Sequence, residues 1–158
     1  MITVTFDIRY KFVCPMQKFK KLVRAVCARF GLEKARVGIA VVDNRYIRKL
    51  NEKFLHRKAA TDCLAFDLSQ AGDKQRLFEI IVNGQRAKSE AAKRGHSFEA
   101  ELALYITHGL LHNLGFDDHR PGQARKMHRL EDEILQKQGY GQVYEKNKLV
   151  LNKRRQKC

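Results

Sequence analysis

The amino-acid sequence predicts an α+β fold: a single domain with a small, mixed, four-stranded sheet packed with about five helices. The length of 158 residues suits one domain with a sizeable core. Hydrophobic residues make up 44% of the chain, and only 2 prolines and 10 glycines occur, which argues against collagen-like, low-complexity and mostly disordered chains. The spacing of apolar residues changes between the strand period and the helix period in the order β-α-β-α-β-β-α-α-α, with no internal repeat and no linker.

Four segments have the pattern of β-strands. The first alternates between apolar and polar residues, and the second is almost wholly apolar, which is typical of an inner strand. The third and fourth are joined by a polar turn at residues 70–74. The four predicted strands span residues 2–9, 35–43, 61–69 and 76–82.

Five segments have the pattern of helices. Pro15 suits the first turn of the first helix, and Gly31 suits the position just past its end. Ser97 is a suitable N-cap for the fourth helix, and Gly115 is placed to end it. The third helix is polar and basic, so one of its faces is expected to be in solvent. The predicted helices span residues 15–30, 44–54, about 84–94, 97 to about 114, and about 121–138.

The chain carries a large excess of positive charge. It has 32 Lys and Arg against 17 Asp and Glu, which leaves a net charge of +15. An excess of this size predicts attraction to a polyanion, and nucleic acid is the commonest one in a cytoplasm. Two other interpretations are an anionic membrane surface, for which no basic amphipathic helix with a Trp or Phe face stands out, and a solvated basic surface with no partner.

Targeting and redox signals predict a cytoplasmic protein. No run of 18 apolar residues occurs, so no membrane span is expected. The N-terminal segment has Asp7 within its apolar stretch and lacks a small-residue cleavage site, unlike a signal peptide. The cysteines are far apart and are expected to be reduced, with Cys27 in the core and Cys158 free at the end of a basic tail.

The most informative segment lies at the end of the fourth predicted helix. His108 and His112 are four residues apart, so their rings leave one helix face a single turn apart and can hold one metal ion. Gly115 lets the chain turn back, so that a residue a few positions later can supply a third ligand. Three protein ligands and an open fourth position are typical of a catalytic zinc. The histidine pair alone favours ordinary surface or core histidines. Gly115 and the Asp-Asp-His sequence at 117–119 reverse this and favour the metal site.

The segment also resembles the HExxH motif of metalloproteases, but with one difference. Those enzymes need a Glu directly after the first His as general base. Gly109 occupies that position here and cannot take a proton from water. A metal-dependent peptidase is therefore the weakest of the enzymatic interpretations, and another kind of hydrolysis is expected.

The segment HGLLHNLGFDDH, residues 108–119, resembles the HGxLHLxGYDH signature of the YbeY family of endoribonucleases, which act in ribosomal RNA maturation. LNEKFLHRKAATDCLAF, residues 50–66, is similar to a second segment of that family, with Thr61 and Asp62 in register. The resemblance covers roughly residues 1–140, which are expected to form the endoribonuclease domain. The basic tail at 141–158 is not covered, and its composition is compatible with a disordered arm or a phosphate-contacting one.

The resemblance implies one Zn²⁺ per chain in a cleft lined by basic residues, and zinc-dependent cleavage of single-stranded RNA. It implies a role in maturation of the 16S ribosomal RNA 3′ end and in ribosome quality control, with the small ribosomal subunit and assembly factors as partners. His108 and His112 match the first two zinc ligands of the family. The third lies six residues after the second, at Asp118; His119 is one further on, and the register favours Asp118.

The sequence departs from the family at an arginine. Leu55 stands at that position, with Arg57 two residues later. Arg57 is therefore the candidate to steady the scissile phosphate beside His108 and His112; the alternative is a solvated loop charge. Thr61 and Asp62 either cap a turn or place Asp62 beside a ligand histidine. The alternative to an enzyme is an RNA-binding ribosome-assembly factor with a structural zinc, and Leu55 would then be a sign of lost catalysis.

Overall fold

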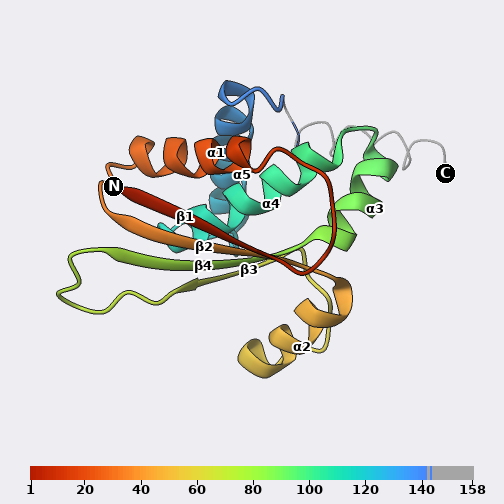
Figure 1. Ribbon diagram of the computed structural model, residues 1–158, viewed down its shortest axis with the longest axis horizontal. Helices are drawn as coiled ribbons and strands as arrows, with labels where there is room; N and C mark the ends of the chain where they lie inside the picture. The colour runs from red at the N-terminus through yellow and green to blue at the C-terminus, as the bar shows by residue number, and fades with distance from the viewer. Residues whose placement is uncertain (142, 144–158) are drawn as a thin grey trace.

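The computed structural model describes residues 1–141 and 143, and these residues form one α+β domain (Figure 1). The chain forms four strands and five helices in the described residues, as predicted. In chain order they are β1 (Ile2–Ile8), α1 (Met16–Arg29), β2 (Ala35–Val42), α2 (Asn44–Leu55), β3 (Cys63–Asp67), β4 (Arg76–Asn83), α3 (Gly84–Arg94), α4 (Phe98–Asn113) and α5 (Pro121–Lys137).

The sheet is mixed, as predicted, and its strand order is β1-β2-β4-β3. β1, β2 and β4 are parallel, with Val4 opposite Val37 and Val37 opposite Phe78. β3 runs antiparallel to β4 at the edge of the sheet, with Cys63 opposite Val82. The start of β3 therefore lies at the same end of the sheet as the carboxyl ends of β2 and β4.

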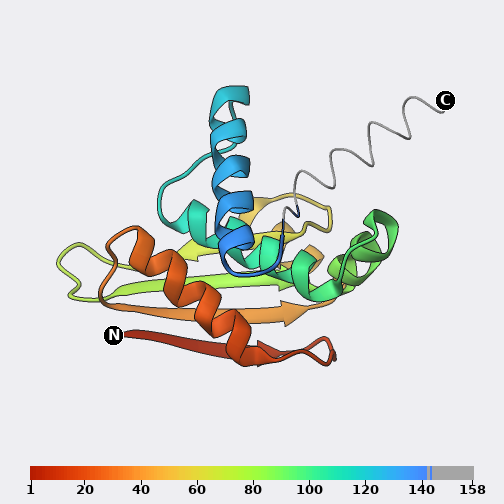
Figure 2. The same ribbon diagram turned by 90° about the horizontal axis from the view of Figure 1, so that it is seen from above.

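The main core lies between one face of the sheet and the helices α1, α4 and α5 (Figures 1 and 2). Alternate residues of the inner strands point into it, among them Val37, Ile39 and Ile80. α4 is buried on most of its surface, because the sheet covers one side and α1 and α5 cover others. Its apolar residues are accordingly distributed all round the helix.

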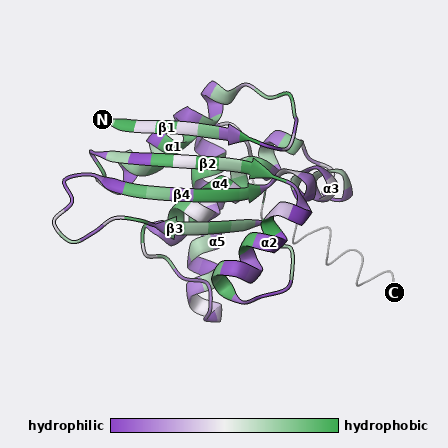
Figure 3. Ribbon diagram, turned by 60° about the horizontal axis from the view of Figure 1, so that its bottom comes forward, coloured by the Kyte–Doolittle hydropathy of each residue, from purple (hydrophilic) through white to green (hydrophobic). Residues whose placement is uncertain are grey.

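The opposite face of the sheet is covered only in part (Figure 3). α2 packs there through Ile47, which joins Val42 and Leu64 in a second, smaller cluster. Asp43 caps this helix, since its carboxylate accepts a hydrogen bond from the backbone N–H of Tyr46 at 2.8 Å.

β3 is two residues shorter at each end than the predicted strand at 61–69. Before it, Thr61 and Asp62 are held by Asn83: the Asn83 backbone N–H donates to the Asp62 carbonyl at 2.8 Å, and its side-chain amide donates to the Thr61 carbonyl at 3.1 Å. After it, Asp67 accepts a hydrogen bond from the backbone N–H of Ser69 and turns the chain. Backbone bonds to the β4 segment reach one residue beyond β3 at each end, since the Leu68 N–H also donates to the Leu77 carbonyl at 2.8 Å.

The cysteines within the described residues are free thiols. Cys27 is fully buried in the core, as predicted, and burial raises the pKa of its thiol to about 11. Cys158 and the predicted basic tail lie outside the described residues, apart from Gly141 and Val143. Among the helices that the structure describes, none has the length and apolar character needed to cross a bilayer.

Candidate metal centre

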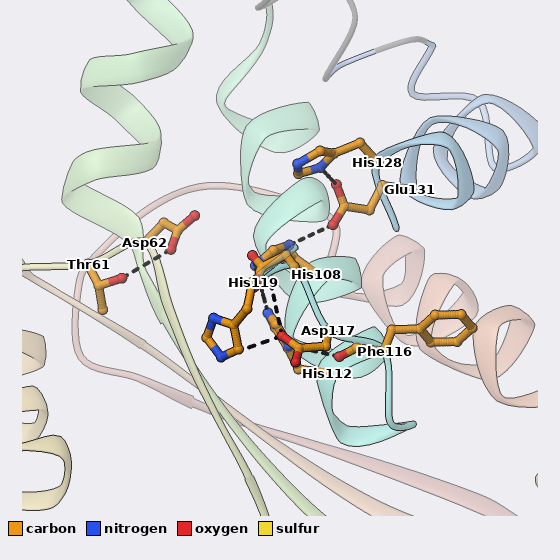
Figure 4. Close-up of polar contacts among 10 residues, drawn as sticks. Thr61, Asp62, His108, His112, Phe116, Asp117, His119, His128 and Glu131 are labelled. Carbon is orange, nitrogen blue, oxygen red and sulfur yellow. Dashed lines mark hydrogen bonds and ion pairs between the residues drawn. The ribbon is translucent and has the colours of Figure 1, made fainter. Parts of the chain in front are cut away.

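The last two turns of α4 bring His108 and His112 together (Figure 4). Their ring centroids are 4.5 Å apart, their planes are nearly perpendicular, and the two Nε2 atoms lie 3.0 Å from each other. Both side chains are only partly buried, so the pair is accessible from solvent. The spacing of one helical turn thus places the two rings side by side, as predicted.

The other ring nitrogens show where the protons of these histidines are. Nδ1 of His108 donates to the carboxylate of Glu131 at 2.6 Å, and Nδ1 of His112 donates to the backbone carbonyl of Phe116 at 3.1 Å. A neutral imidazole has a single N–H, and here each one is used at Nδ1. When both rings are neutral, two Nε2 lone pairs therefore face each other across 3.0 Å, an arrangement that a cation between them would stabilise.

Asp118 completes a group of three donors. The chain reverses after α4 at Gly115, whose φ of 97° lies in the region that favours glycine. The Asp118 carboxylate then lies 3.7 Å from Nε2 of His108 and 3.8 Å from Nε2 of His112. Ligands of a tetrahedral zinc, at about 2.0–2.1 Å from the ion, lie roughly 3.3 Å from one another. The donor atoms and their separations fit such an ion, with the fourth position left for another molecule.

His119, the alternative third ligand, is not part of the group that contains the two helix histidines. Its side chain is 79% exposed, and its Nε2 lies 3.5 Å from Asp117 rather than beside the histidine pair. Its backbone N–H also donates to the Asp117 carboxylate at 3.1 Å. Asp117, Asp118 and His119 form a second group of possible metal donors on the surface of the loop, but the group that contains both helix histidines contains Asp118.

Glu131 is a site residue that the sequence analysis missed. It lies on α5, its side chain is 1% exposed, and its two oxygens accept hydrogen bonds from His108 and from His128, the latter at 3.0 Å. Burial alone raises the pKa of this carboxyl, but the two histidine hydrogen bonds outweigh burial and lower the pKa below its ordinary value. For His108 the balance is the reverse: burial lowers the pKa, and the bond and charge of Glu131 raise it overall.

A signal for Glu131 was present in the sequence. The residue lies four positions after Met127 and three before Ile134, on the apolar face of the last predicted helix. An acid on such a face needs a polar partner inside the protein. His108 and His128 are those partners.

Gly109 has a packing role that excludes a larger residue. A Cβ atom at this position would lie 2.7 Å from Sγ of Cys63 and 2.8 Å from Cγ2 of Ile80. α4 approaches β3 and β4 closely because Gly109 has no side chain. The glutamate of an HExxH metalloprotease therefore has no room here, which agrees with the interpretation drawn from the sequence.

Thr61 and Asp62 lie beside the site but do not bond to its histidines (Figure 4). The Thr61 hydroxyl donates to the Asp62 carboxylate at 3.2 Å. The charge of Asp62 contributes to the raised pKa of His108, without a hydrogen bond to its ring in the described part of the chain. The carboxylate that orients His108 is Glu131.

Arg57 lies on the exposed segment between α2 and β3. It follows His56, which ends α2 in the left-handed conformation at φ 56°. Its backbone N–H donates to the carbonyl of Asn51 at 3.3 Å. Within residues 1–141 and 143, the structure shows no contact of its side chain with His108 or His112, so the two parts of the predicted catalytic set are not brought together.

The fold and the site define a class: an α+β protein whose central helix ends in two histidines that, with one aspartate, could hold a cation. The sequence profile of the YbeY family, described as Endoribonuclease YbeY, matches residues 8–139. The chain belongs to the YbeY family, and the resemblance found in the sequence is confirmed.

Several relatives carry the name Endoribonuclease YbeY. The one from Carboxydothermus hydrogenoformans is 37% identical over 99 residues, which are 63% of this chain and 69% of the relative. The one from Geobacillus thermodenitrificans is 33% identical over 135 residues, 78% of this chain and 86% of the relative. The relative from Myxococcus xanthus is longer. It is 36% identical over 120 residues, which are 73% of this chain but only 41% of the relative.

A solved structure shows the same fold. The solution structure of TM1509 from Thermotoga maritima superposes with a TM-score of 0.55 at 21% sequence identity, and covers 87% of this chain and 91% of that one.

Proposed function

We propose that this protein is a zinc-dependent endoribonuclease that cleaves single-stranded RNA, with one Zn²⁺ held by His108, His112 and Asp118. The observation that carries the proposal is the pair of Nε2 lone pairs facing each other at 3.0 Å beside the Asp118 carboxylate. Membership of a family whose members are named endoribonucleases supports RNA as the substrate and hydrolysis as the reaction.

A zinc ion at this position supplies Lewis acidity, which lowers the pKa of bound water and polarises a phosphoryl oxygen. The protein's own residues prepare the site for it. Glu131 fixes the His108 ring so that Nε2 faces the site, and the Phe116 carbonyl does the same for His112. Asp118 adds a negative charge that partly balances the cation.

The net charge of +15 supports a nucleic acid as substrate. Each phosphate neutralised by Lys or Arg adds affinity that salt removes. Unpaired RNA is expected because a single strand can follow a concave surface that a stiff A-form helix cannot enter.

The finer assignment rests on the family resemblance. We propose that the substrate is ribosomal RNA in the cytoplasm, with action in 16S ribosomal RNA 3′ end maturation and ribosome quality control. The small ribosomal subunit and its assembly factors are the partners proposed on the same ground.

A catalytic role for Arg57 stays a prediction. Its exposed position leaves the side chain free to reach a bound phosphate. If it does so, Arg57→Gln lowers kcat for RNA cleavage while zinc affinity is unchanged. If Arg57 is a solvated loop charge, kcat is unchanged as well.

Leu55 favours a second candidate function. It stands where the family has an arginine, and its side chain is exposed. A protein that lost catalysis would bind RNA as a ribosome-assembly factor and use its metal for structure. In that case removal of one ligand unfolds the domain, as for structural zinc sites in general.

The experiment that tests the proposed function compares His112→Ala with His119→Ala on end-labelled single-stranded RNA. His119 is the matched control, because it is a histidine of the same segment that does not belong to the group of His108, His112 and Asp118. We expect cleavage by the wild type and His119→Ala, and none by a folded His112→Ala. Equal cleavage by all three proteins, or cleavage by none, would contradict the proposal, and unfolding of His112→Ala would favour the assembly factor.

A further inference from the structure

A basic groove of about 620 Å³ lies between the first turns of α2 and α3 and the segment that precedes β3. Four cations line it: Arg45 and Arg48 from α2, Lys58 from the segment before β3, and Arg86 from α3. Small polar and alanine side chains supply the rest of the lining, and none of the described lining residues is acidic or aromatic. This groove was not predicted from the sequence.

The four cations of the basic groove are not neutralised by neighbours. Within residues 1–141 and 143, none of them takes part in an ion pair. Arg45 and Arg48 are three residues apart on α2, so both side chains leave the same face. Asp43 borders a smaller cavity that shares Arg45 with the groove, and its carboxylate caps α2. The groove therefore presents unbalanced positive charge.

Asn83 holds the three walls of the basic groove together. This residue is fully buried, and its side-chain Oδ1 accepts a hydrogen bond from the Arg86 backbone N–H at 2.9 Å, which caps α3. Its amide donates to the Asn44 side chain at 2.6 Å and to the Thr61 carbonyl at 3.1 Å. One side chain thus joins α2, α3 and the segment before β3, so the groove is formed before any ligand binds.

The basic groove lies close, along the chain, to the candidate metal centre. Ala60 lines the groove, and Asp62, two residues on, lies beside that centre (Figure 4). Two residues of extended chain span at most about 7 Å. A strand bound at His108 and His112 can therefore continue past Thr61 and Asp62 into the groove.

We infer that the basic groove binds the phosphate backbone of the RNA strand outside the part cut at the metal centre; this inference rests on the proposed function. The groove recognises phosphodiesters rather than bases, because it offers cations and no aromatic side chain on which a base could stack. Binding there is consequently tolerant of sequence and sensitive to salt.

The test compares Arg45→Gln/Arg48→Gln with Lys21→Gln/Arg24→Gln. The control pair removes the same charge at the same helical spacing from exposed positions of α1, outside the groove. Binding of a fluorescent single-stranded 20-nucleotide RNA is measured by anisotropy across a salt series, and cleavage kinetics are measured for that RNA and for a 5-nucleotide RNA. Lys58→Gln provides a second, single-residue variant of the groove.

We expect the groove variant to bind the long RNA roughly tenfold more weakly, with the slope of log affinity against log salt reduced by about 1.4. Its KM for the long RNA rises while kcat, and both constants for the short RNA, stay at wild-type values. If the groove and control variants bind the long RNA equally well while the wild type cleaves RNA, the inference about the groove is overturned and the proposed function is left intact. Groove-dependent binding with no cleavage by any protein would support the groove and overturn the proposed nuclease.

Discussion

The carboxylate of Glu131 lies 2.6 Å from Nδ1 of His108 and determines which nitrogen of that histidine faces the metal centre. The two residues are 23 positions apart and belong to different helices, α4 and α5. Because a carboxylate only accepts, Nδ1 must carry the proton and Nε2 is left as the free donor. The contact between the helices thus sets the chemistry of the site.

Replacement of Glu131 weakens zinc binding without removing a ligand. We expect Glu131→Ala to lower the affinity for Zn²⁺ by about 10- to 100-fold, because the His108 ring loses its orienting acceptor. Glu131→Gln retains an acceptor oxygen and loses less. Competition with a chromogenic chelator measures the affinities. The control is Glu133→Gln, also on α5, which removes an exposed charge paired with Arg29 of α1. Equal zinc affinity of Glu131→Ala and this control is the opposing result.

Gly109, in α4, is expected to tolerate no side chain. Its added methyl would meet Cys63 and Ile80 at 2.7 and 2.8 Å, so Gly109→Ala must push α4 away from the sheet. We expect a loss of about 1–3 kcal/mol in the free energy of unfolding, measured by urea denaturation.

Gly122→Ala is the matched control for Gly109→Ala. Gly122 lies in the first turn of α5, and a methyl there meets only the end of the Arg125 side chain, at 3.8 Å. The change should be neutral or stabilising by up to about 1 kcal/mol, since alanine is the better helix former. Similar unfolding curves for both variants would show that the close approach at Gly109 is not a constraint on the fold.

His56 ends α2 in a conformation that costs free energy for a residue with a side chain. It is the non-glycine residue with positive φ in the described chain, and its backbone N–H closes α2 on the carbonyl of Glu52. We expect His56→Gly to raise the free energy of unfolding by about 1 kcal/mol, measured by urea denaturation. Lys53→Gly, within the last turn of α2, should lower it by a similar amount. Destabilisation by both changes would mean that the imidazole of His56 contributes more than its backbone costs.

The fold class followed from the sequence because apolar spacing is a local property. All nine elements were placed within a few residues, and the zinc-ligand candidates lie in one short segment where helix geometry and a glycine turn relate them directly. The strand order β1-β2-β4-β3 depends on pairing between distant segments and was not predicted. His128 and Glu131 were missed for the same reason, because their relation to His108 exists only once α5 has packed on α4.

The central claim is that one cation at His108, His112 and Asp118 makes this protein a ribonuclease, and a metal add-back titration tests it most directly. Metal-free protein receives increasing equivalents of Zn²⁺, and the cleavage rate of end-labelled single-stranded RNA is followed beside Asp118→Ala and Asp117→Ala. The account predicts no cleavage without metal, a rate that reaches its maximum at one equivalent, loss of this response in Asp118→Ala, and its retention in Asp117→Ala. Undiminished cleavage by the metal-free protein, or an unchanged response in Asp118→Ala, would contradict it.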